Sequence, residues 1–220
     1  MNTVENRRPL KSRDTGWARG LARGLAGMGA SPDLISAGSV LFALLGGGFL
    51  WLSAGEDGMD RAALLLGAAL CVQLRLMCNL LDGMVAVEHG RGGPAGPIWN
   101  ELPDRVADAL FLAGAGYGAG MALSGAGVPL GWAAAVLAVM TAYVRELGRA
   151  LGFAADFSGP MAKPQRMATL TAACIIASAE GAWGWRGETL AIALAVIVLG
   201  AAVTVIRRTA RLAGRLKERG

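Results

Sequence analysis

The chain has 220 residues, 54% of them hydrophobic, and a formal net charge of +5. Its mean hydropathy of +0.47 exceeds that of ordinary water-soluble domains, so the composition excludes a typical soluble protein. The basic residues form no stripe interleaved with aromatic residues, which argues against a nucleic-acid-binding protein.

The first thirty residues divide into a polar tail and a short amphipathic segment. We expect residues 1–15 to be a disordered cytoplasmic tail, and they lack the early apolar core of a cleavable signal. In residues 16–30, Trp17, Leu21 and Leu25 recur every four residues, with arginines elsewhere on the helical wheel. This pattern predicts a juxtamembrane helix that lies on the membrane surface.

Apolar runs follow one another from residue 31 to residue 206. A membrane-spanning helix needs about 20 mostly apolar residues. Six runs approach this length: Leu34–Ala54, Ala62–Leu81, Val106–Leu123, Val128–Val144, Met167–Trp185 and Thr189–Ile206. The first run follows a Ser-Pro-Asp sequence typical of a helix start. The sequence therefore predicts an all-α membrane protein with six transmembrane helices, residues 31–206, and a basic cytoplasmic tail, residues 207–220.

Lysine and arginine are distributed unequally between the two sides of the predicted membrane domain. The terminal tails and the loops after the second and fourth runs hold most of them, whereas the opposite loops hold only Arg61 and Arg186. Because basic residues gather on the cytoplasmic side, both termini and the loop after the second run should be cytoplasmic. We expect a multi-pass protein of a bacterial inner membrane, whose net charge also suits anionic lipid headgroups.

The third run contains residues that predict its start and its packing. It follows Pro103, which suits the first turn of a helix because its missing N–H costs little there. Two overlapping pairs of glycines stand four residues apart within it: Gly114 with Gly118, and Gly116 with Gly120. Small residues at this spacing are typical of closely packed membrane helices.

Polar side chains gather where the second run ends and the third begins. Arg75, Asn79 and Asp82 stand at i, i+4 and i+7, so they share one face of a helix. Asp104 and Asp108 share a face of the next helix for the same reason. Ionisable groups within membrane spans are costly and usually functional. Solvated acids without a function are therefore the weaker interpretation of this arrangement.

The residue types in this group predict a metal site. Converging carboxylates repel one another unless a cation neutralises them. Oxygen ligands without histidine or cysteine favour Mg²⁺ or Mn²⁺ over Zn²⁺, and such an ion beside a membrane usually indicates phosphate or pyrophosphate chemistry. Gly83 and Ala86 lie beside the same face, where small side chains would let a ligand approach closely.

The stretch from residue 79 to residue 108 resembles the signature of the CDP-alcohol phosphotransferases, D-x2-D-G-x2-A-R, a loop, and G-x3-D-x3-D. It matches this signature at five positions: Asp82, Gly83, Ala86, Asp104 and Asp108. The segments GMGASPDLISAGSV and SGPMAKPQRMATL also resemble parts of the family, so the resemblance extends over residues 17–206.

The resemblance implies a six-helix enzyme that transfers a substituted phosphoryl group from a CDP-alcohol to an acceptor hydroxyl and releases CMP. It implies Mg²⁺ or Mn²⁺ bound by Asn79, Asp82, Asp104 and Asp108, with Asp108 as the general base. We expect the nucleotide and donor to contact Arg75, Asn79, Asp82, Gly83, Ala86 and Asn100. The expected donor is CDP-diacylglycerol, because the site opens at the level of lipid headgroups.

Three residues replace the first aspartate, the arginine and the second glycine of the signature: Asn79, Val87 and Asn100. Asn79 can still bind a metal through its amide oxygen but brings no negative charge, so one ion is better neutralised than two. Glu88 or Glu101 could supply the missing charge as an extra ligand. His89 could contact the nucleotide, although an exposed loop histidine is the simpler interpretation.

The acceptor is less well defined by the sequence. Lys163 matches a family position that helps to bind the acceptor's phosphate, and Arg166 and Arg149 are further candidates for this phosphate site. Such a site would select a phosphorylated polyol such as glycerol 3-phosphate. An unphosphorylated acceptor such as inositol or serine remains an alternative.

Two other functions remain open. The altered signature permits a non-catalytic or divergent family member that binds CDP-lipid. A small membrane transporter is a weaker alternative, because the acids lie at helix ends and no internal repeat is visible. The sequence does not indicate the oligomeric state, and the resemblance allows a homodimer.

Overall fold

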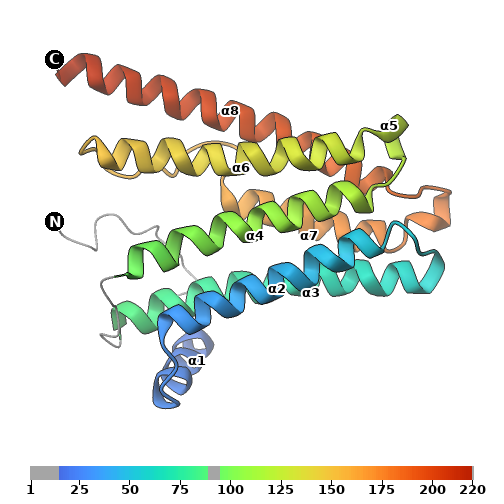
Figure 1. Cartoon of the computed structure of the whole chain (residues 1–220), viewed down its shortest axis with the longest axis horizontal. Coiled ribbons are helices and arrows are strands. Elements are labelled where there is room, and N and C mark those ends of the chain that lie inside the picture. The colour runs from blue at the N-terminus through green and yellow to red at the C-terminus, as the bar shows by residue number, and fades with distance from the viewer. Residues whose placement is uncertain (1–14, 89–94, 220) are drawn as a thin grey trace.

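The computed structural model describes residues 15–88 and 95–219, which fold into helices. In chain order these are α1 (Gly16–Gly27), α2 (Pro32–Leu52), α3 (Gly58–Glu88), α4 (Gly96–Gly118), α5 (Ala122–Gly125), α6 (Gly127–Ala150), α7 (Lys163–Ala177), the 3₁₀ helix η2 (Glu180–Trp183) and α8 (Glu188–Arg219). The long helices α2, α3, α4, α6, α7 and α8 run side by side along one axis, while α1 stands off at an angle near one end (Figure 1).

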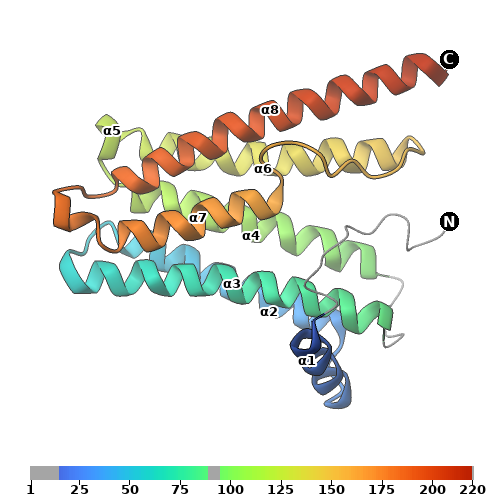
Figure 2. The ribbon, with the colours of Figure 1, turned by 180° about the vertical axis from the view of Figure 1, so that it is seen from behind.

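The six long helices form a closed ring. Each packs against two neighbours in the order α2, α4, α6, α8, α7, α3 and back to α2. Figure 1 shows α4 between α2 and α6, and Figure 2 shows α7 between α3 and α8. We call the end of this ring where α3 ends and α4 begins the site end. Because successive long helices along the chain run in opposite directions, α7 begins and α8 ends toward this same side.

Within the described residues, four helices are long and apolar enough to cross a membrane: α2, α3, α6 and α8. The other two long helices differ from the predicted spans. α4 carries several charged residues in its first half, and α7 has 15 residues, which give it a length of about 22 Å against about 30 Å of hydrocarbon. That α4 and α7 also span the membrane therefore stays a prediction.

The start of α4 corrects the expected place of Pro103. The helix begins at Gly96 with a proline in its first turn, so Pro103 lies inside the helix. Two prolines in this segment suit a first turn equally well, and the earlier one takes that place. Asp104 and Asp108 consequently lie two to three turns into α4. The start of α2 is as predicted, with Ser31 Oγ accepting from the Leu34 backbone N–H at 3.2 Å.

The predicted run Met167–Trp185 does not form one helix. α7 ends at Ala177, and Glu180 begins the short helix η2. The Glu180 carboxylate is buried and accepts from Arg61 Nη2 at 2.9 Å and from the Thr189 backbone N–H at 3.2 Å. This buried charge, expected within a span, thus caps the start of α8 and closes the end of the ring opposite the site end.

Helix α1 packs against the end of α3 through a face that the sequence pattern did not single out. Ala18 and Ala22 are fully buried, in one apolar cluster with Met84 of α3. Trp17 and Leu21 are exposed on another face of the helix. A helix at residues 16–30 is thus present, and its contact with a membrane surface remains a prediction for the exposed face.

Glycines set the distance between α4 and its two neighbours. A Cβ atom built on Gly114 would lie 2.5 Å from the Gly47 carbonyl oxygen of α2, and one on Gly116 would lie 2.9 Å from Cα of Gly131 of α6. Such backbone contact requires small residues on both helices. The predicted close packing is therefore present at Gly114, Gly116 and Gly118, and it fixes α4 between α2 and α6. It is absent at Gly120, which follows the end of α4 and whose Cβ would meet nothing within 4 Å among the described residues.

Alanine substitutions of two adjacent glycines in α2 test this packing. We expect Gly47→Ala to destabilise the protein by about 1–3 kcal/mol, the usual cost of overpacking. Its Cβ would lie 2.8 Å from the Leu110 carbonyl oxygen, whereas nothing lies within 4 Å of a Cβ at Gly48. Gly48→Ala is the matched control and should leave the thermal unfolding temperature in detergent unchanged or slightly raised. Equal unfolding temperatures for the two variants would contradict this packing.

Candidate functional site

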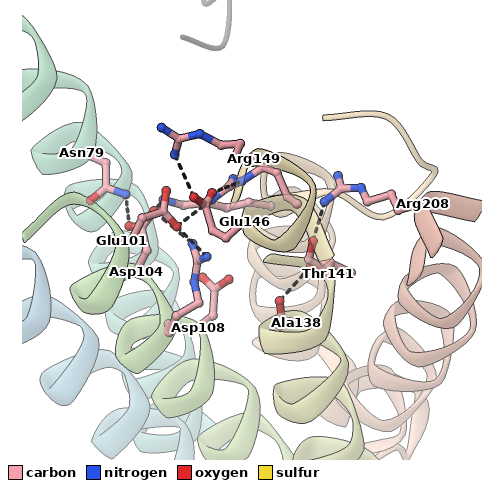
Figure 3. A network of polar contacts seen from close by, with 12 residues as sticks. Asn79, Glu101, Asp104, Asp108, Ala138, Thr141, Glu146, Arg149 and Arg208 are labelled. Carbon is pink, nitrogen blue, oxygen red and sulfur yellow. Dashed lines mark hydrogen bonds and ion pairs between the residues drawn. The ribbon is translucent and has the colours of Figure 1, made fainter. Parts of the chain in front are cut away.

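Three aspartates from two helices meet at the site end of the ring. Asp82 comes from α3, and Asp104 and Asp108 come from α4. We call these three residues the carboxylate cluster. Figure 3 shows Asn79 of α3 reaching toward Asp104, with Asp108 one turn further along α4. The structure thus brings together the two helical faces that the sequence spacing predicts.

Arg75 lies beneath the cluster and joins α3 to α4. Its side chain is fully buried, and Nη2 donates to Asp104 Oδ1 at 3.0 Å and to Asp108 Oδ1 at 3.2 Å. The same nitrogen lies 3.2 Å from the Asp104 carbonyl oxygen. Nε and Nη1 are buried and have no hydrogen-bond partner among the described residues. Arg75 therefore faces the carboxylates from the interior of the bundle.

Two basic side chains of α7 bind the same carboxylates from the other side. Lys163 Nζ donates to Asp104 Oδ2, and Arg166 Nη2 donates to Asp108 Oδ2 at 2.7 Å. The amide of Asn79 donates to Asp104 Oδ1. Each oxygen of Asp104 and Asp108 thus accepts at least one hydrogen bond from a side chain of the chain itself. Lys163 and Arg166 were expected at the acceptor phosphate, and these contacts with the aspartates were not predicted.

Asp82 has a different environment from the two aspartates of α4. Its Oδ2 accepts from Ser36 Oγ of α2 at 2.6 Å. Its Oδ1 is buried and has no hydrogen-bond partner within residues 15–88 and 95–219. Ser36 was not predicted as a site residue, although it belongs to the segment GMGASPDLISAGSV that resembles the family. That resemblance was the available signal for this residue.

Within the carboxylate cluster, the position that suits a divalent cation is beside Asp82 Oδ1, which has no hydrogen-bond partner among the described residues. An unpaired buried carboxylate oxygen is costly unless a cation or proton joins it. No group of three or more His, Cys, Asp or Glu residues within the described ranges is arranged to hold a metal ion. Asp104 and Asp108 bind basic side chains instead, so the fit is limited to one ion at Asp82, with Asn79 and Asp104 as its neighbours.

The remaining acid candidates have other partners or lie outside the described residues. Glu101 Oε2 accepts from Arg105 at 2.9 Å and from Arg145 at 2.6 Å. His89 lies outside the described residues, and so do the side chains of Glu88 and Asn100. An extra metal ligand at Glu88 or Glu101 stays a prediction.

A basic pocket adjoins the carboxylate cluster. Its lining residues come from α4, α6, α7, α8 and the segment before α7: Arg105, Thr141, Ala142, Arg145, Phe157, Ala162, Lys163, Arg166 and Arg208. Five of these nine side chains are cationic, which favours an anionic ligand. Arg149 is not part of the lining; it is exposed and pairs with Glu146 at 2.8 Å (Figure 3).

The segment between α6 and α7 is tied to the end of α8 beside this pocket. Arg208 donates to the carbonyl oxygens of Ser158 at 2.9 Å and Thr141 at 2.6 Å. Partial burial raises the pKa of Asp156, but hydrogen bonds from Ser158 and the charges of Arg208 and Arg211 lower it more, so this pKa lies below its usual value. Asp156 is therefore ionised near neutral pH and helps to fix the segment that forms one wall of the pocket.

Solved structures of known proteins share the fold of this chain. No protein-family model matches the chain. The *Mycobacterium tuberculosis* phosphatidylinositol phosphate synthase, in complex with manganese and citrate, superimposes with a TM-score of 0.72 at 18% identity over 89% of this chain and 88% of that one. The same synthase with CDP-DAG bound gives a TM-score of 0.71 at 18% identity over 89% and 92% of the two chains. The chain has the fold of a CDP-alcohol phosphotransferase.

A sequence relative supports the same resemblance. The bifunctional IPC transferase and DIPP synthase of *Rubrobacter xylanophilus* is 36% identical over 115 residues, which are 52% of this chain. The match spans 23% of that relative's length. The resemblance to the CDP-alcohol phosphotransferases predicted from the sequence is confirmed by these comparisons in fold and in sequence.

The different partners of the aspartates predict different effects on stability. Asp108→Ala removes the carboxylate that pairs with Arg166 and one of the two that pair with Arg75, so we expect a loss of about 3–5 kcal/mol. Asp82→Ala removes a carboxylate that has no ion-pair partner within 4 Å among the residues that the structure describes, and it should cost little or stabilise the fold. Thermal unfolding in detergent, without added metal or nucleotide, measures both. A larger loss in Asp82→Ala than in Asp108→Ala would contradict the assignment of the ion pairs.

Proposed function

We propose that this protein transfers a phosphatidyl group from CDP-diacylglycerol to an acceptor hydroxyl, with Mg²⁺ or Mn²⁺ as cofactor and CMP as product. The observation that carries the proposal is the meeting of Asp82, Asp104 and Asp108 beside a basic pocket, within a phosphotransferase fold. The carboxylates suit a metal-bound diphosphate, and the pocket suits a second anion. Such a protein would act in phospholipid biosynthesis.

The donor is proposed from the position and character of the site. The cluster lies at the ends of apolar helices, where a lipid headgroup would lie, and a neighbour of similar fold has been crystallised with CDP-DAG. Gly83 and Ala86 leave room on α3 for the diphosphate and cytidine, with Asn79 and Asn100 as further contacts. Arg75 would act on the diphosphate through Asp104 and Asp108, because it is buried beneath them.

In the proposed reaction the acceptor oxygen attacks the β-phosphorus of the CDP-alcohol. A new phosphorus–oxygen bond forms, the bond from this phosphorus to the oxygen of CMP breaks, and the hydroxyl proton passes to Asp108 as general base. A bound divalent cation would neutralise the diphosphate and the leaving CMP, and Asp82, Asn79 and Asp104 would hold it. Ser36 would keep Asp82 oriented with its free oxygen toward the ligand.

The contacts of Asp108 suggest how the acceptor would enable proton transfer. Both of its oxygens accept from guanidinium groups, Arg75 at 3.2 Å and Arg166 at 2.7 Å. A carboxylate held in this way is a poor base until one contact is released. An acceptor phosphate in the basic pocket would attract Arg166, which lines that pocket. We therefore favour a phosphorylated polyol such as glycerol 3-phosphate as acceptor over an unphosphorylated alcohol.

The proposal also covers the membrane in which the protein lies and its orientation there. We propose an integral membrane protein, in a bacterial inner membrane, with the site end and both termini in the cytoplasm. The basic residues at the site end support this orientation. A homodimer is compatible with the proposal and is not required by it.

Removal of the proposed base should reduce turnover strongly. We expect Asp108→Asn to lower kcat for CMP release from CDP-diacylglycerol by about 10²–10⁴-fold, the usual contribution of a general base. Asp57→Asn is the matched control, because Asp57 is exposed near the opposite end of the ring. CMP formation is measured with Mg²⁺ and a panel of phosphorylated and unphosphorylated alcohols. Full activity of folded Asp108→Asn would exclude the base role.

Substitution of Lys163 at the basic pocket should weaken binding of the acceptor more than binding of the donor. We expect Lys163→Met to raise KM for a phosphorylated acceptor by about 10–100-fold, as for a lost hydrogen bond to a charged group. Lys217→Met, in the exposed last turns of α8, is the control. An unchanged KM for every phosphorylated acceptor would contradict a phosphate site at Lys163.

One observation favours a second candidate, a non-catalytic protein that binds CDP-lipid. The described residues contain no ready-made metal group of three acids, and Asn79 replaces an aspartate of the signature. The CMP-release assay separates the candidates. Folded protein that binds CDP and releases no CMP with any acceptor would favour the binding function over the transferase.

A further inference from the structure

The carboxylate cluster is electrically balanced by side chains of the chain itself. Its three aspartates carry three negative charges, and three cations bind Asp104 and Asp108 directly: Arg75, Lys163 and Arg166. A fourth, Arg105, lies 3.5 Å from Asp104 and pairs more closely with Glu101, at 2.9 Å. Asp108, Arg75 and Arg166 are almost completely buried, so these charges are poorly screened by water. A divalent cation that entered this balanced group alone would add two uncompensated positive charges in a poorly hydrated place.

Two residues of α3 account for this balance. Asn79 stands where the family signature has its first aspartate, which removes one negative charge. Arg75, one turn earlier, adds one positive charge and binds Asp104 and Asp108 directly. Compared with the same group carrying an aspartate at position 79 and a neutral residue at position 75, it is more positive by two charges, which is the charge of one Mg²⁺ or Mn²⁺. Val87, which replaces the arginine of the signature, is exposed on α3 and is not counted in this group.

We infer that Arg75 takes the place of one divalent cation, so that the site binds a single ion and binds it together with the diphosphate of its ligand. The inference rests on the proposed function and concerns the same site. Arg75 is a positioning residue in this account, because it holds Asp104 and Asp108 from the interior and does not contact the ligand.

An unpaired oxygen marks the place for the remaining ion. Asp82 is 6% exposed, and its Oδ1 lacks a hydrogen-bond partner among the described residues. One carboxylate oxygen with the Asn79 amide is a weak site for a divalent cation by itself, because hard cations require several oxygen ligands. A diphosphate supplies both further oxygens and the negative charge that the balanced cluster lacks.

Manganese titration of the full-length protein in detergent tests this inference without measuring turnover. The electron paramagnetic resonance signal of free Mn²⁺ reports how much is bound, with and without CDP. We expect no saturable binding at micromolar Mn²⁺ alone, and saturation at one ion per chain when CDP is present. Two ions per chain with CDP, or the same affinity with and without it, would overturn the inference.

Charge variants on α3 identify the residue responsible. We expect Arg75→Leu and Asn79→Asp each to strengthen Mn²⁺ binding without nucleotide by about tenfold or more, since each makes the cluster more negative by one charge a few ångströms from the ion. Arg186→Leu, an exposed arginine near the opposite end of the ring, should bind as the unaltered protein does. Asn79→Asp retains Arg75, so it remains informative if Arg75→Leu does not fold. Unchanged Mn²⁺ affinity in folded Arg75→Leu or in Asn79→Asp would overturn the role of Arg75.

Inorganic pyrophosphate separates this inference from the proposed function. If pyrophosphate promotes binding of one Mn²⁺ but CDP does not, the inference holds and a CDP-alcohol donor is excluded. If neither diphosphate promotes Mn²⁺ binding while CMP is still released from CDP-diacylglycerol, the proposed function holds and the inference fails.

Discussion

A negative charge that is buried two turns inside a packed helix has to be neutralised where it lies. Asp104 and Asp108 of α4 are in this position, and Asp108 is 1% exposed. A buried carboxylate without partners would cost several kcal/mol or would take up a proton. Arg75 of α3 meets both carboxylates from the interior, and two basic residues of α7 meet them from the pocket side. This set of ion pairs joins three helices of the ring and positions the oxygen atoms available to a ligand.

The local part of this arrangement could be predicted from the sequence. Helical periodicity places Arg75, Asn79 and Asp82 on one face and Asp104 and Asp108 on another, and the structure brings these faces together. The partners of the aspartates could not be predicted in this way, because Lys163 lies 59 residues from Asp104 along the chain. Only the packing of α7 in the ring creates that contact.

The helix boundaries, too, could not all be predicted from local sequence patterns. Residues 97 and 103 are both prolines that suit a first turn, and the sequence does not tell which of them starts α4. α7 ends before Glu180, which caps the start of α8 and bonds to Arg61, 119 residues away along the chain. By contrast, the glycines of α4 predicted close packing correctly, since contact at that spacing depends mainly on side-chain size.

The residues of these ion pairs contribute both to the stability of the fold and to the proposed reaction. The same basic residues that stabilise the carboxylate cluster also line or adjoin the pocket in which an acceptor phosphate would bind. The most direct test is a crystal structure with CDP and Mn²⁺, in which anomalous scattering locates the metal. The account predicts one manganese peak beside Asp82 with Arg75 still bound to Asp104 and Asp108. Two peaks, or a peak between Asp104 and Asp108 with Arg75 displaced, would contradict it.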